Sequence, residues 1–532
     1  MVRVHRWAGN GLMPLGNPYR ALLGAAGGGA TNWISLLQLN VDSPTAGGTQ
    51  FQFQSNETEG GASVAVGSDG HVYTVVGSTP AYGYKVQKYT DAGVLVWQNS
   101  QLLAGTSVSH QWDVGRIAVD STHNVYVSTR QWYTSGGNWK SYTTLIKYNA
   151  AGVLQFTREY STNGTTGNPL GSGTTYKRFD ASGLAIDSSD NVLIGGVSAD
   201  TFPSGTGDSA FITKLDSSAV DVWSPNMLGF ANDGTNWSGR TTTSIDTDAS
   251  DNIYAGGYER SAYTGVYSKA RISKWNASGT LQWQKSYAGG NDLHVNKGTP
   301  YDVYPPGVDG SGQRRQPMIS VENSTGDSYM GFSFGRIIKV NNAGVHQWNQ
   351  QLGVQYDIYS VDAGGDYLYF VGQDVTLTIN ASPDVNRTGF VGRLNASTGA
   401  LDWMNKFEGH RDVLLALMQS CQLTGCKYHA DGLYVVGNTA RYSYAGDAMV
   451  LGKLPLDGSG TGAVTGVSVA SPSGTLVYDF SYTALAVTPV GSQTITEATT
   501  TVSTMTTTGS LLATSNWGTV ATATDVNVVT NI

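Results

Sequence analysis

A sequence unit recurs seven times along this chain of 532 residues, and it limits the possible folds more than any other feature. A typical copy, KWNASGTLQW from Lys274 to Trp283, contains a basic residue, a polar turn with Gly and a closing Trp. Successive basic residues are 59, 67, 60, 65, 54 and 60 positions apart, and they are Lys88, Lys147, Lys214, Lys274, Lys339, Arg393 and Lys453. Self-similarity at such a spacing indicates one supersecondary unit per repeat.

A second motif precedes each basic residue. SVAVGSDGHVYTVVG (63–77) and LAIDSSDNVLIGG (184–196) are clear copies, and each has a short apolar strand, a turn rich in Asp, Ser, Asn and Gly, and a second strand. Such turns are typical of β-hairpins. The two motifs together predict four antiparallel strands per unit. Seven units of this kind predict an all-β fold with a seven-bladed β-propeller.

The two ends of the repeat array predict how the ring closes. The seventh unit has Lys453 but no aromatic residue after its turn, whereas TNWISLLQ near the front has a Trp with no repeat before it. We therefore expect residues 32–38 to form the outer strand of the last blade, which would leave no open sheet edge at the joint. The closing aromatic series then reads Trp33, Trp97, Phe156, Trp223, Trp283, Trp348 and Trp403.

The repeat pair resembles bacterial and phage seven-bladed propeller repeats, whose units read roughly A-x-D-x-x-G-N-V-Y-x-x-G followed by K-L-x-x-x-G. The resemblance covers about residues 32–460 and implies the fold rather than a function. After residue 460 the chain is Thr/Ser/Val-rich, and its charges are Asp479, Glu497 and Asp525. Similar Thr/Ser-rich ends follow such repeats in structural proteins of marine tailed phages.

Three domains follow from these observations. Residues 1–31 begin basic and contain no continuous apolar core, so we interpret them as an N-terminal arm or anchor and not as a secretion signal. Residues 32–460 form the propeller. Residues 461–532 are expected to be a small C-terminal β segment used for attachment or oligomerisation, either as a β-domain, as strands shared between subunits or as a flexible tail.

Long connections are predicted on one face of the ring, at 98–114, 157–180, 224–240, 284–316 and 404–426 between blades and at 129–143 and 258–270 inside blades. They contain rigid aromatic rings among small polar residues, a composition typical of binding surfaces. The candidate residues for contacts with a sugar or partner protein are Arg130, Trp132, Tyr133, Trp139, Arg260, Tyr263, Tyr267, Arg441, Tyr442 and Tyr444. The alternative is that these rings pack the loops against one another.

Other kinds of site find little support in the sequence. Asp246, Asp248 and Asp251 in DTDASDN resemble the start of a calcium loop, but the Gly at the sixth place and the distant Glu are missing, so a turn is favoured. Cys421 and Cys426 are spaced for a local disulfide, and a packed or bridged loop pair is expected. LNASTGALDW (394–403) resembles the Trp-docking repeat of quinoprotein dehydrogenases, which we interpret as architectural. We expect no metal, no cofactor and no catalytic residues.

Charge and hydropathy limit the partners. The net charge is −8, and no Lys/Arg run could neutralise a phosphate backbone, so nucleic acid is not an expected partner. No apolar run reaches membrane-spanning length. The leading hypothesis is a non-enzymatic virion protein of a tailed phage, a tail, fibre or nozzle-like component in a homo-oligomeric or larger assembly, binding other virion proteins or a host surface glycan or receptor. The alternatives are a secreted or surface bacterial propeller that binds glycans or proteins, and a polysaccharide lyase or hydrolase on the same scaffold.

Overall fold

The protein is described by a computed structural model. The described residues are 32–38, 63–78, 83–103, 111–135, 138–161, 178–199, 209–228, 238–261, 268–289, 318–332, 335–353, 355–374, 388–409, 419–441, 448–459, 462–471, 474–487, 489, 495–499, 504–506, 510–512, 517–519 and 526–531. Within these ranges the chain forms strands and turns, and no helix there has the length and hydropathy that a membrane span requires. The N-terminal arm predicted at 1–31 lies outside the described residues.

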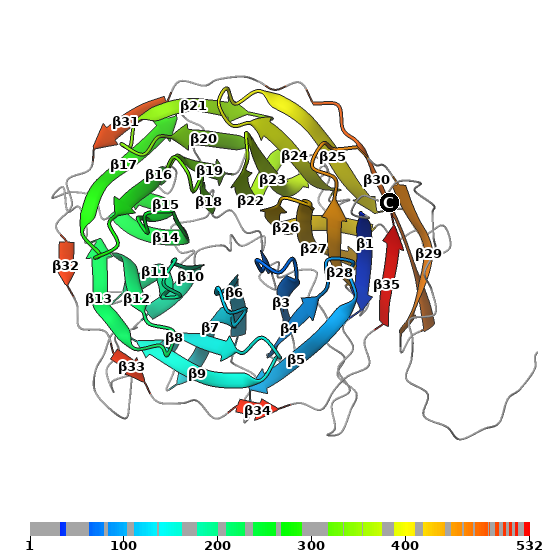
Figure 1. Cartoon of the computed structure of the whole chain (residues 1–532), viewed down its shortest axis with the longest axis horizontal. Helices are drawn as coiled ribbons and strands as arrows, with labels where there is room; N and C mark the ends of the chain where they lie inside the picture. Colours follow the sequence, from blue (N-terminus) through cyan, green and yellow to red (C-terminus); the bar gives the residue numbers. More distant parts are fainter. Residues whose placement is uncertain are drawn as a thin grey trace, which may run out of the picture.

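Seven four-stranded antiparallel blades surround a central axis (Figure 1). Blade 1 contains β2 (Ser63–Val66), β3 (Val72–Ser78), β4 (Gly83–Tyr89) and β5 (Leu95–Leu103). Blade 2 contains β6 (Gln111–Val119), β7 (Val125–Ser135), β8 (Asn138–Tyr148) and β9 (Leu154–Ser161). Blade 3 contains β10 (Arg178–Ile186), β11 (Val192–Ala199), β12 (Ser209–Leu215) and β13 (Asp221–Leu228). Blade 4 contains β14 (Ser238–Thr247), β15 (Ile253–Ser261), β16 (Ser268–Trp275) and β17 (Leu281–Gly289).

The remaining blades follow the same order from the axis outwards. Blade 5 contains β18 (Met318–Val321), β19 (Ser328–Phe332), β20 (Arg336–Val340) and β21 (His346–Gln351). Blade 6 contains β22 (Tyr356–Gly364), β23 (Tyr367–Asp374), β24 (Thr388–Asn395) and β25 (Leu401–Gly409). Blade 7 contains β26 (Gln419–His429), β27 (Gly432–Arg441), β28 (Ala448–Leu454) and, as its fourth strand, β1 (Trp33–Gln38) from the front of the chain. The sequence prediction of a seven-bladed all-β propeller is therefore confirmed.

The hydrophobic core lies between neighbouring blades and not inside any one of them. One cluster joins Tyr73 and Val86 of blade 1 to Val125 and Ile146 of blade 2, and all four side chains are inaccessible to solvent. Comparable clusters join blades 2 and 3, 3 and 4, 4 and 5, 5 and 6, and 6 and 7. Because each sheet buries both faces against its neighbours, the central strands are rich in Val, Ile and Tyr, which suit a pleated buried surface.

Ring closure occurs as the sequence predicted. β1 pairs antiparallel with β28 over its whole length, and Trp33 lies opposite Lys453. In blades 1, 3, 4, 5 and 6 the closing Trp also lies opposite the basic residue of its unit, as Trp283 does opposite Lys274. Trp33 therefore occupies the seventh place in the series by register.

The C-terminal strands lie against the outside of the ring (Figure 1). They are β29 (Gly462–Ser471), β30 (Gly474–Ala484), β31 (Ile495–Thr499), β32 (Thr504–Thr506), β33 (Ser510–Leu512), β34 (Trp517–Thr519) and β35 (Val526–Asn531), here called the C-terminal belt. In chain order the belt pairs with blades 6, 4, 3, 2, 1 and 7, so it runs round the ring against the order of the blades (Figure 1). Its last strand, β35, pairs with β1.

One predicted long connection is a strand pair instead. The segment 129–143 was expected to be a loop, but β7 and β8 remain paired from Val125 opposite Tyr148 to Ser135 opposite Asn138. Thr, Tyr and Trp residues in both segments continue the strands past the usual blade height, and their β-propensity favours this. Blade 2 therefore has a hairpin that extends further than those of its neighbours.

Candidate functional site

The basic residue of each repeat makes contacts that stabilise the propeller. Its side chain lies over the ring of a Tyr on the neighbouring strand in six of the seven repeats, with Lys274 Nζ 5.1 Å from the centroid of Tyr254 and Lys339 Nζ 5.3 Å from that of Tyr329. Cations near such a ring face are attracted by its quadrupole. Burial lowers the pKa of Lys274, and the nearby Asp248 carboxylate opposes that effect.

The same basic residues also reach the next blade. Lys147, Lys339 and Arg393 donate to backbone carbonyls of the neighbouring blade over 2.8, 3.1 and 2.7 Å. Lys214 reaches Ala277 O over 3.4 Å, and Lys274 donates to the side chain of Asn342. These contacts repeat from blade to blade, so they have an architectural role.

The closing Trp residues pack on a turn of the next blade. Trp283 Nε1 donates to Asn342 O over 2.9 Å and Trp348 Nε1 to Ala396 O over 3.0 Å. Their indoles cover Gly344 and Gly399, which have φ of 79° and 72°. A Cβ on either glycine would come within 2.9 Å of the indole, and positive φ also disfavours a side chain. Trp97 and Trp403 make the same contact with Gly152 and Gly458.

Several lysines bind a turn aspartate, and the pair at Lys214 is the most buried. Lys214 Nζ lies 2.6 Å from Asp187 Oδ2, and the side chains are 9% and 1% exposed. Burial alone would raise the pKa of Asp187, but the hydrogen bonds from Lys214 and Asn191 outweigh it and hold the pKa below its usual value. Asp69 and Asp431, in the corresponding turns of blades 1 and 7, also have lowered pKa values.

These lowered pKa values predict acid sensitivity. A carboxylate whose folded pKa is depressed stabilises the protein above its unfolded pKa, and the stabilisation is lost as the pH falls through the folded value. Because unfolded Asp titrates near pH 3.9, we expect the thermal unfolding midpoint to decrease as the pH is lowered from about 5 to about 3. Differential scanning fluorimetry over this pH range measures the midpoint. Asp187→Asn should lower the thermal midpoint at pH 7 and make the midpoint less dependent on pH below about pH 5. An unchanged pH dependence would contradict the role of Asp187 as a stabilising carboxylate.

The three aspartates of the calcium-like motif have separate tasks. Asp248 Oδ1 accepts the backbone N–H groups of Ser250 and Asn252, each over 2.9 Å, which confirms the turn interpretation. Asp251 accepts two hydrogen bonds from Ser188 of blade 3. Asp246 faces the central axis. In the described residues no group of three or more His, Cys, Asp or Glu side chains is arranged to hold a metal ion.

The cysteines belong to a strand and not to a loop. Cys421 and Cys426 lie five positions apart on β26, and both are free thiols. A strand rises about 3.3 Å per residue, which places them too far apart for a disulfide. Burial raises the pKa of Cys421 to about 12 and that of Cys426 further. A buried thiol of this kind packs rather than reacts.

The backbone places some of the predicted binding residues on one face. Arg130, Trp132 and Tyr133 lie near the end of β7 and Trp139 near the start of β8, so all four belong to the extended hairpin of blade 2. Arg260 and Arg441 lie at the corresponding ends of β15 and β27. The remaining candidates lie outside the described residues: Tyr263, Tyr267, Tyr442 and Tyr444. The binding role of all ten stays a prediction.

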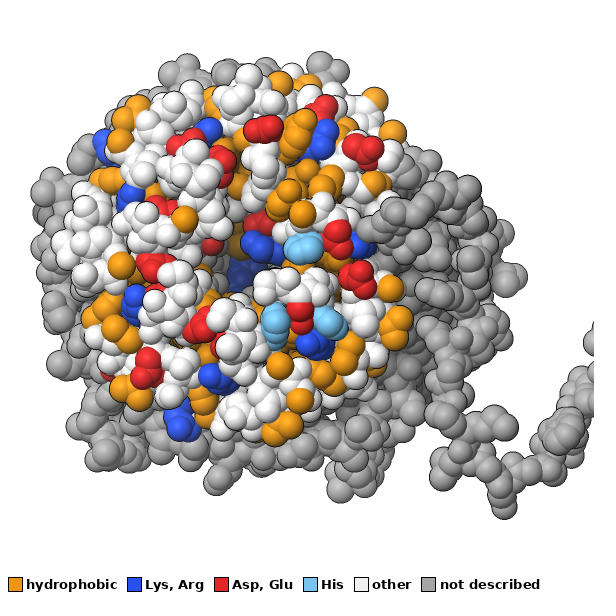
Figure 2. Space-filling model, viewed as in Figure 1, with side chains coloured by type: hydrophobic (Ala, Val, Ile, Leu, Met, Phe, Trp, Pro, Cys, Tyr) orange, Lys and Arg blue, Asp and Glu red, His pale blue; other side chains and the backbone are white. Residues whose placement is uncertain are grey.

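A cavity that the sequence did not single out lies on the axis. It has a volume of about 250 Å³ and is lined by the inner strands of all seven blades. Figure 2 shows a hollow at the centre of the ring with Lys and Arg side chains inside it. We call this cavity the axial chamber.

One wall of the axial chamber is polar and connects blades 4 to 7. Asp246 accepts the backbone N–H of Val321 over 2.8 Å, and Ser320 accepts that of Ala363 over 3.0 Å. Asp362 continues the series by accepting the N–H of Tyr428 over 2.6 Å. The equivalent positions in blades 1 to 3 are Ala65, Ala118 and Ala185, identified by their shared register on the second strand.

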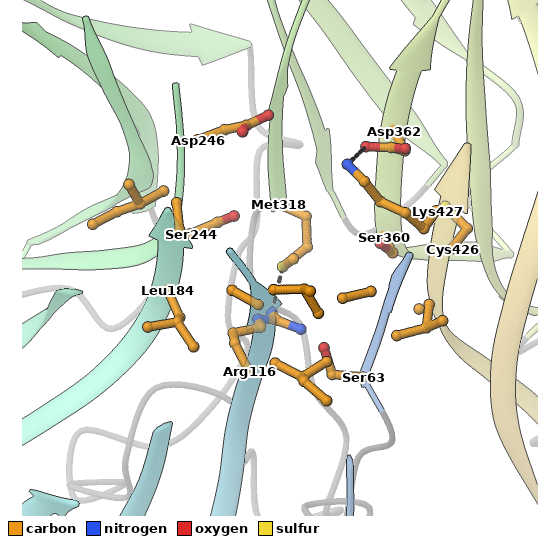
Figure 3. Close-up of a pocket in the computed structure, with 18 of the residues that line it drawn as sticks. Ser63, Arg116, Leu184, Ser244, Asp246, Met318, Ser360, Asp362, Cys426 and Lys427 are labelled. Carbon is orange, nitrogen blue, oxygen red and sulfur yellow. Dashed lines mark hydrogen bonds and ion pairs between the residues drawn. The ribbon is translucent and has the colours of Figure 1, made fainter. Parts of the chain in front are cut away.

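An ion pair completes the polar wall. Lys427 Nζ lies 2.8 Å from Asp362 Oδ1 (Figure 3), and both residues line the axial chamber. Burial lowers the pKa of Lys427, but the carboxylates of Asp362 and Asp246 outweigh this effect and raise it. Burial raises the pKa of Asp246, although Lys427 and the N–H of Val321 oppose the shift.

Arg116 and Met318 form a bar across the axis below this wall. They come from blades 2 and 5 and point toward one another in Figure 3, and Arg116 Nη2 contacts Met318 Sδ. Arg116 Nε also donates to Ser182 O over 3.3 Å. Each residue precedes the polar or alanine position of its own strand by two places, so the bar forms the floor of the axial chamber.

The axial residues vary from blade to blade, which is why repeat alignment does not reveal them. Asp246, Ser320, Asp362 and Lys427 occupy one register position, but that position is Asp in two blades, Ser in one and Lys in one. The sequence signal for these chamber residues is a polar or charged residue, in place of alanine, two or three residues before the first turn of a repeat. Chemically, the chamber offers fixed charges and hydrogen-bonding groups suited to binding.

The sequence matches no protein-family model, and no curated protein matches it. Among solved structures, the chain is similar to BamB from Moraxella catarrhalis, with 14% identity over 75% of this chain and 97% of that one and a TM-score of 0.34. The Dos1 propeller matches with 12% identity over 77% and 81% and a TM-score of 0.38. A protein of unknown function from Bacteroides caccae matches with 10% identity over 63% and 92% and a TM-score of 0.32. The chain is a seven-bladed β-propeller, a fold consistent with a scaffold or binding module.

Proposed function

We propose that the protein is a non-enzymatic structural component of a tailed phage particle, a tail, fibre or nozzle-like part whose propeller is a rigid scaffold. The observation that carries the proposal is the closure of the ring by both ends of the chain. β1 lies between β28 and β35, so the joint of the ring is paired on both sides. A particle protein exposed outside the cell gains from such closure, because unpaired sheet edges invite aggregation.

The belt adds to this support. Belt strands cover the outer strand of every blade except blade 5, among the strands that the structure describes. The repeat residues Lys339, Arg393 and Trp348 bind the next blade, which stiffens the ring without any ligand. Rigid scaffolds with variable connections on one face are suited to recognition.

The partners follow from the same reasoning. We infer that the loop face, including the long hairpin of blade 2, binds another virion protein or a host surface glycan or receptor, and that the protein acts within a homo-oligomeric or larger assembly. The net charge of −8 disfavours nucleic acid.

Particle purification tests this function. We expect mass spectrometry of density-purified particles to recover peptides from 63–454 at a constant ratio to the major capsid protein. Antibodies against the propeller should label one structure of the particle in electron micrographs. Recovery only from cell envelopes or culture medium, with an N-terminus trimmed between Ala25 and Ala30, would contradict the proposal and favour a secreted bacterial binding propeller. New reducing ends in host polysaccharide after incubation with the pure protein would instead indicate an enzyme.

A further inference from the structure

Part of the hairpin formed by β29 and β30 projects beyond blade 6. Strand β25 pairs with residues 480–484 of β30, which anchors one half of the hairpin to the propeller. In the other half, residues 474–478 of β30 pair with residues 467–471 of β29, and no other described strand pairs with either segment. We call this half the projecting ribbon. The hairpin lies at the rim of the propeller, where β29 is close to β35 (Figure 1).

The projecting ribbon needs a further strand to be stable. A two-stranded ribbon by itself is marginally stable at best in water, and three or more strands are required. β29 is the last strand of the six-stranded sheet of blade 6, so its outer edge has no partner among the described strands. Every second residue of 467–471 directs its backbone N–H and C=O groups toward that edge. The ribbon therefore presents hydrogen-bond donors and acceptors for one more strand.

The sequence of β29 does not protect this edge. Exposed sheet edges are usually blocked by charged side chains, especially Lys, by Pro or by a bulge. Residues 462–471 are Val, Ala, Ser, Thr and Gly, without a charged residue or a proline. A register shift between Val464 and Val467 bends the strand before the ribbon, but residues 467–471 then stay in regular register with 474–478. The ribbon is therefore an edge that favours pairing.

A second copy of this chain matches the edge in charge and symmetry. The net charge of −8 makes most surfaces of two copies repel, but residues 458–478 contain no charged residue, so two ribbons meet without local repulsion. Two identical strands that pair antiparallel are related by a two-fold axis, the commonest symmetry of homo-oligomers. Each strand then supplies the donors and acceptors that the other needs. The two ribbons together form a four-stranded antiparallel sheet, which exceeds the three strands that stability requires.

We propose that the protein forms a two-fold symmetric dimer through its projecting ribbon, with residues 467–471 of β29 paired antiparallel with the same residues of a second copy. The proposal deepens the homo-oligomeric part of the proposed function and rests on that part. Its tests are measurements on the pure protein in solution, whereas particle purification tests the virion role, so the two fail independently.

Sedimentation velocity of the full chain at a series of concentrations tests for the dimer. We expect a reversible monomer–dimer equilibrium with a dissociation constant below about 20 µM, and a chain that stays monomeric at about 100 µM overturns the proposal. A full chain that is monomeric but dimerises once residues 1–31 are deleted also overturns it, because the N-terminal arm would then be what covers the edge.

Cysteine scanning locates the interface. Single cysteines are placed at each position from 467 to 471, and the native Cys421 and Cys426 do not interfere because both are buried. In an antiparallel self-pairing, oxidation should cross-link the position nearest the two-fold axis best, and the yield should fall on either side of it. Thr280→Cys, in an exposed turn of blade 4, is the control and should not cross-link. Dimers without cross-links at 467–471, or with equal cross-linking at all five positions, would contradict this interface.

A charge pair at the position nearest the axis separates loss of the interface from misfolding. If that position is Val469, the centre of 467–471, then Val469→Lys and Val469→Glu should each dimerise at least about tenfold more weakly, because like charges face each other across the axis. An equal mixture of the two variants should recover dimers, since opposite charges then meet. Thr280→Lys should leave the equilibrium unchanged. The proposal is overturned if both variants dimerise as the unmodified chain does, or if their mixture dimerises no better than either variant alone.

Discussion

Replacing Trp348 with alanine is expected to lower the free energy of unfolding by about 3–5 kcal/mol, the usual range for removing a buried large aromatic side chain. Trp348 is 9% exposed, packs 6.0 Å from the ring of Tyr329 and covers Gly399 of blade 6. Its loss opens a cavity between blades 5 and 6 and leaves Ala396 O without the indole donor. Chemical denaturation followed by circular dichroism measures the change.

Three further variants test how packing and burial set the contribution of Trp348 to stability. Trp348→Phe keeps most of the packing and should cost less than the alanine change. Trp283→Ala should also cost less, because the Trp283 ring is only half-buried in the equivalent place. Gly399→Ala alters the other side of the contact and should destabilise, since its Cβ would meet the indole at 2.8 Å. Equal effects for Trp348→Ala and Trp283→Ala would show that burial does not decide the cost.

Deleting residues 461–532 is expected to have the broadest effect, because it removes the strands that pair with β1, β5, β9, β13, β17 and β25. Amide hydrogen exchange in these six strands should become at least about tenfold faster, since their outer hydrogen bonds are lost. The exposed edges should also promote self-association, visible by light scattering.

Blade 5 provides the internal control for this deletion. No described belt strand pairs with its outer strand β21, so exchange at β21 should change least. A restored full-length chain should recover the slow exchange. If the deletion left the amide exchange rates of all seven outer strands unchanged, the pairing of the belt with the propeller would be contradicted.

The repeat made most of the ring predictable. Each basic residue, turn and Trp occurs in a fixed order, so the number of blades and the place of Trp33 follow from counting alone. The role of Lys274 could not be predicted from the repeat, because its partner Tyr254 lies on another strand and its partner Asn342 on another blade.

The belt and the axial chamber could not be predicted for different reasons. β32, β33 and β34 are three residues long, too short for an alternating pattern, and their partners are set by which blade edges are open. The chamber residues differ at equivalent positions, as Ala118 and Asp246 do, so aligning the repeats treats them as variation. The extended hairpin of blade 2 could have been predicted, because Gly136 and Gly137 separate two β-prone runs by two residues, which is a hairpin-turn signal.

The central claim is that the repeats form a seven-bladed ring closed by the front of the chain and encircled by its end. Electron cryomicroscopy of the full-length protein tests it most directly. The map should show seven blades, with residues 33–38 as the fourth strand of the last blade and 526–531 paired outside them. A different number of blades, or a last blade completed by residues other than 33–38, would contradict the account.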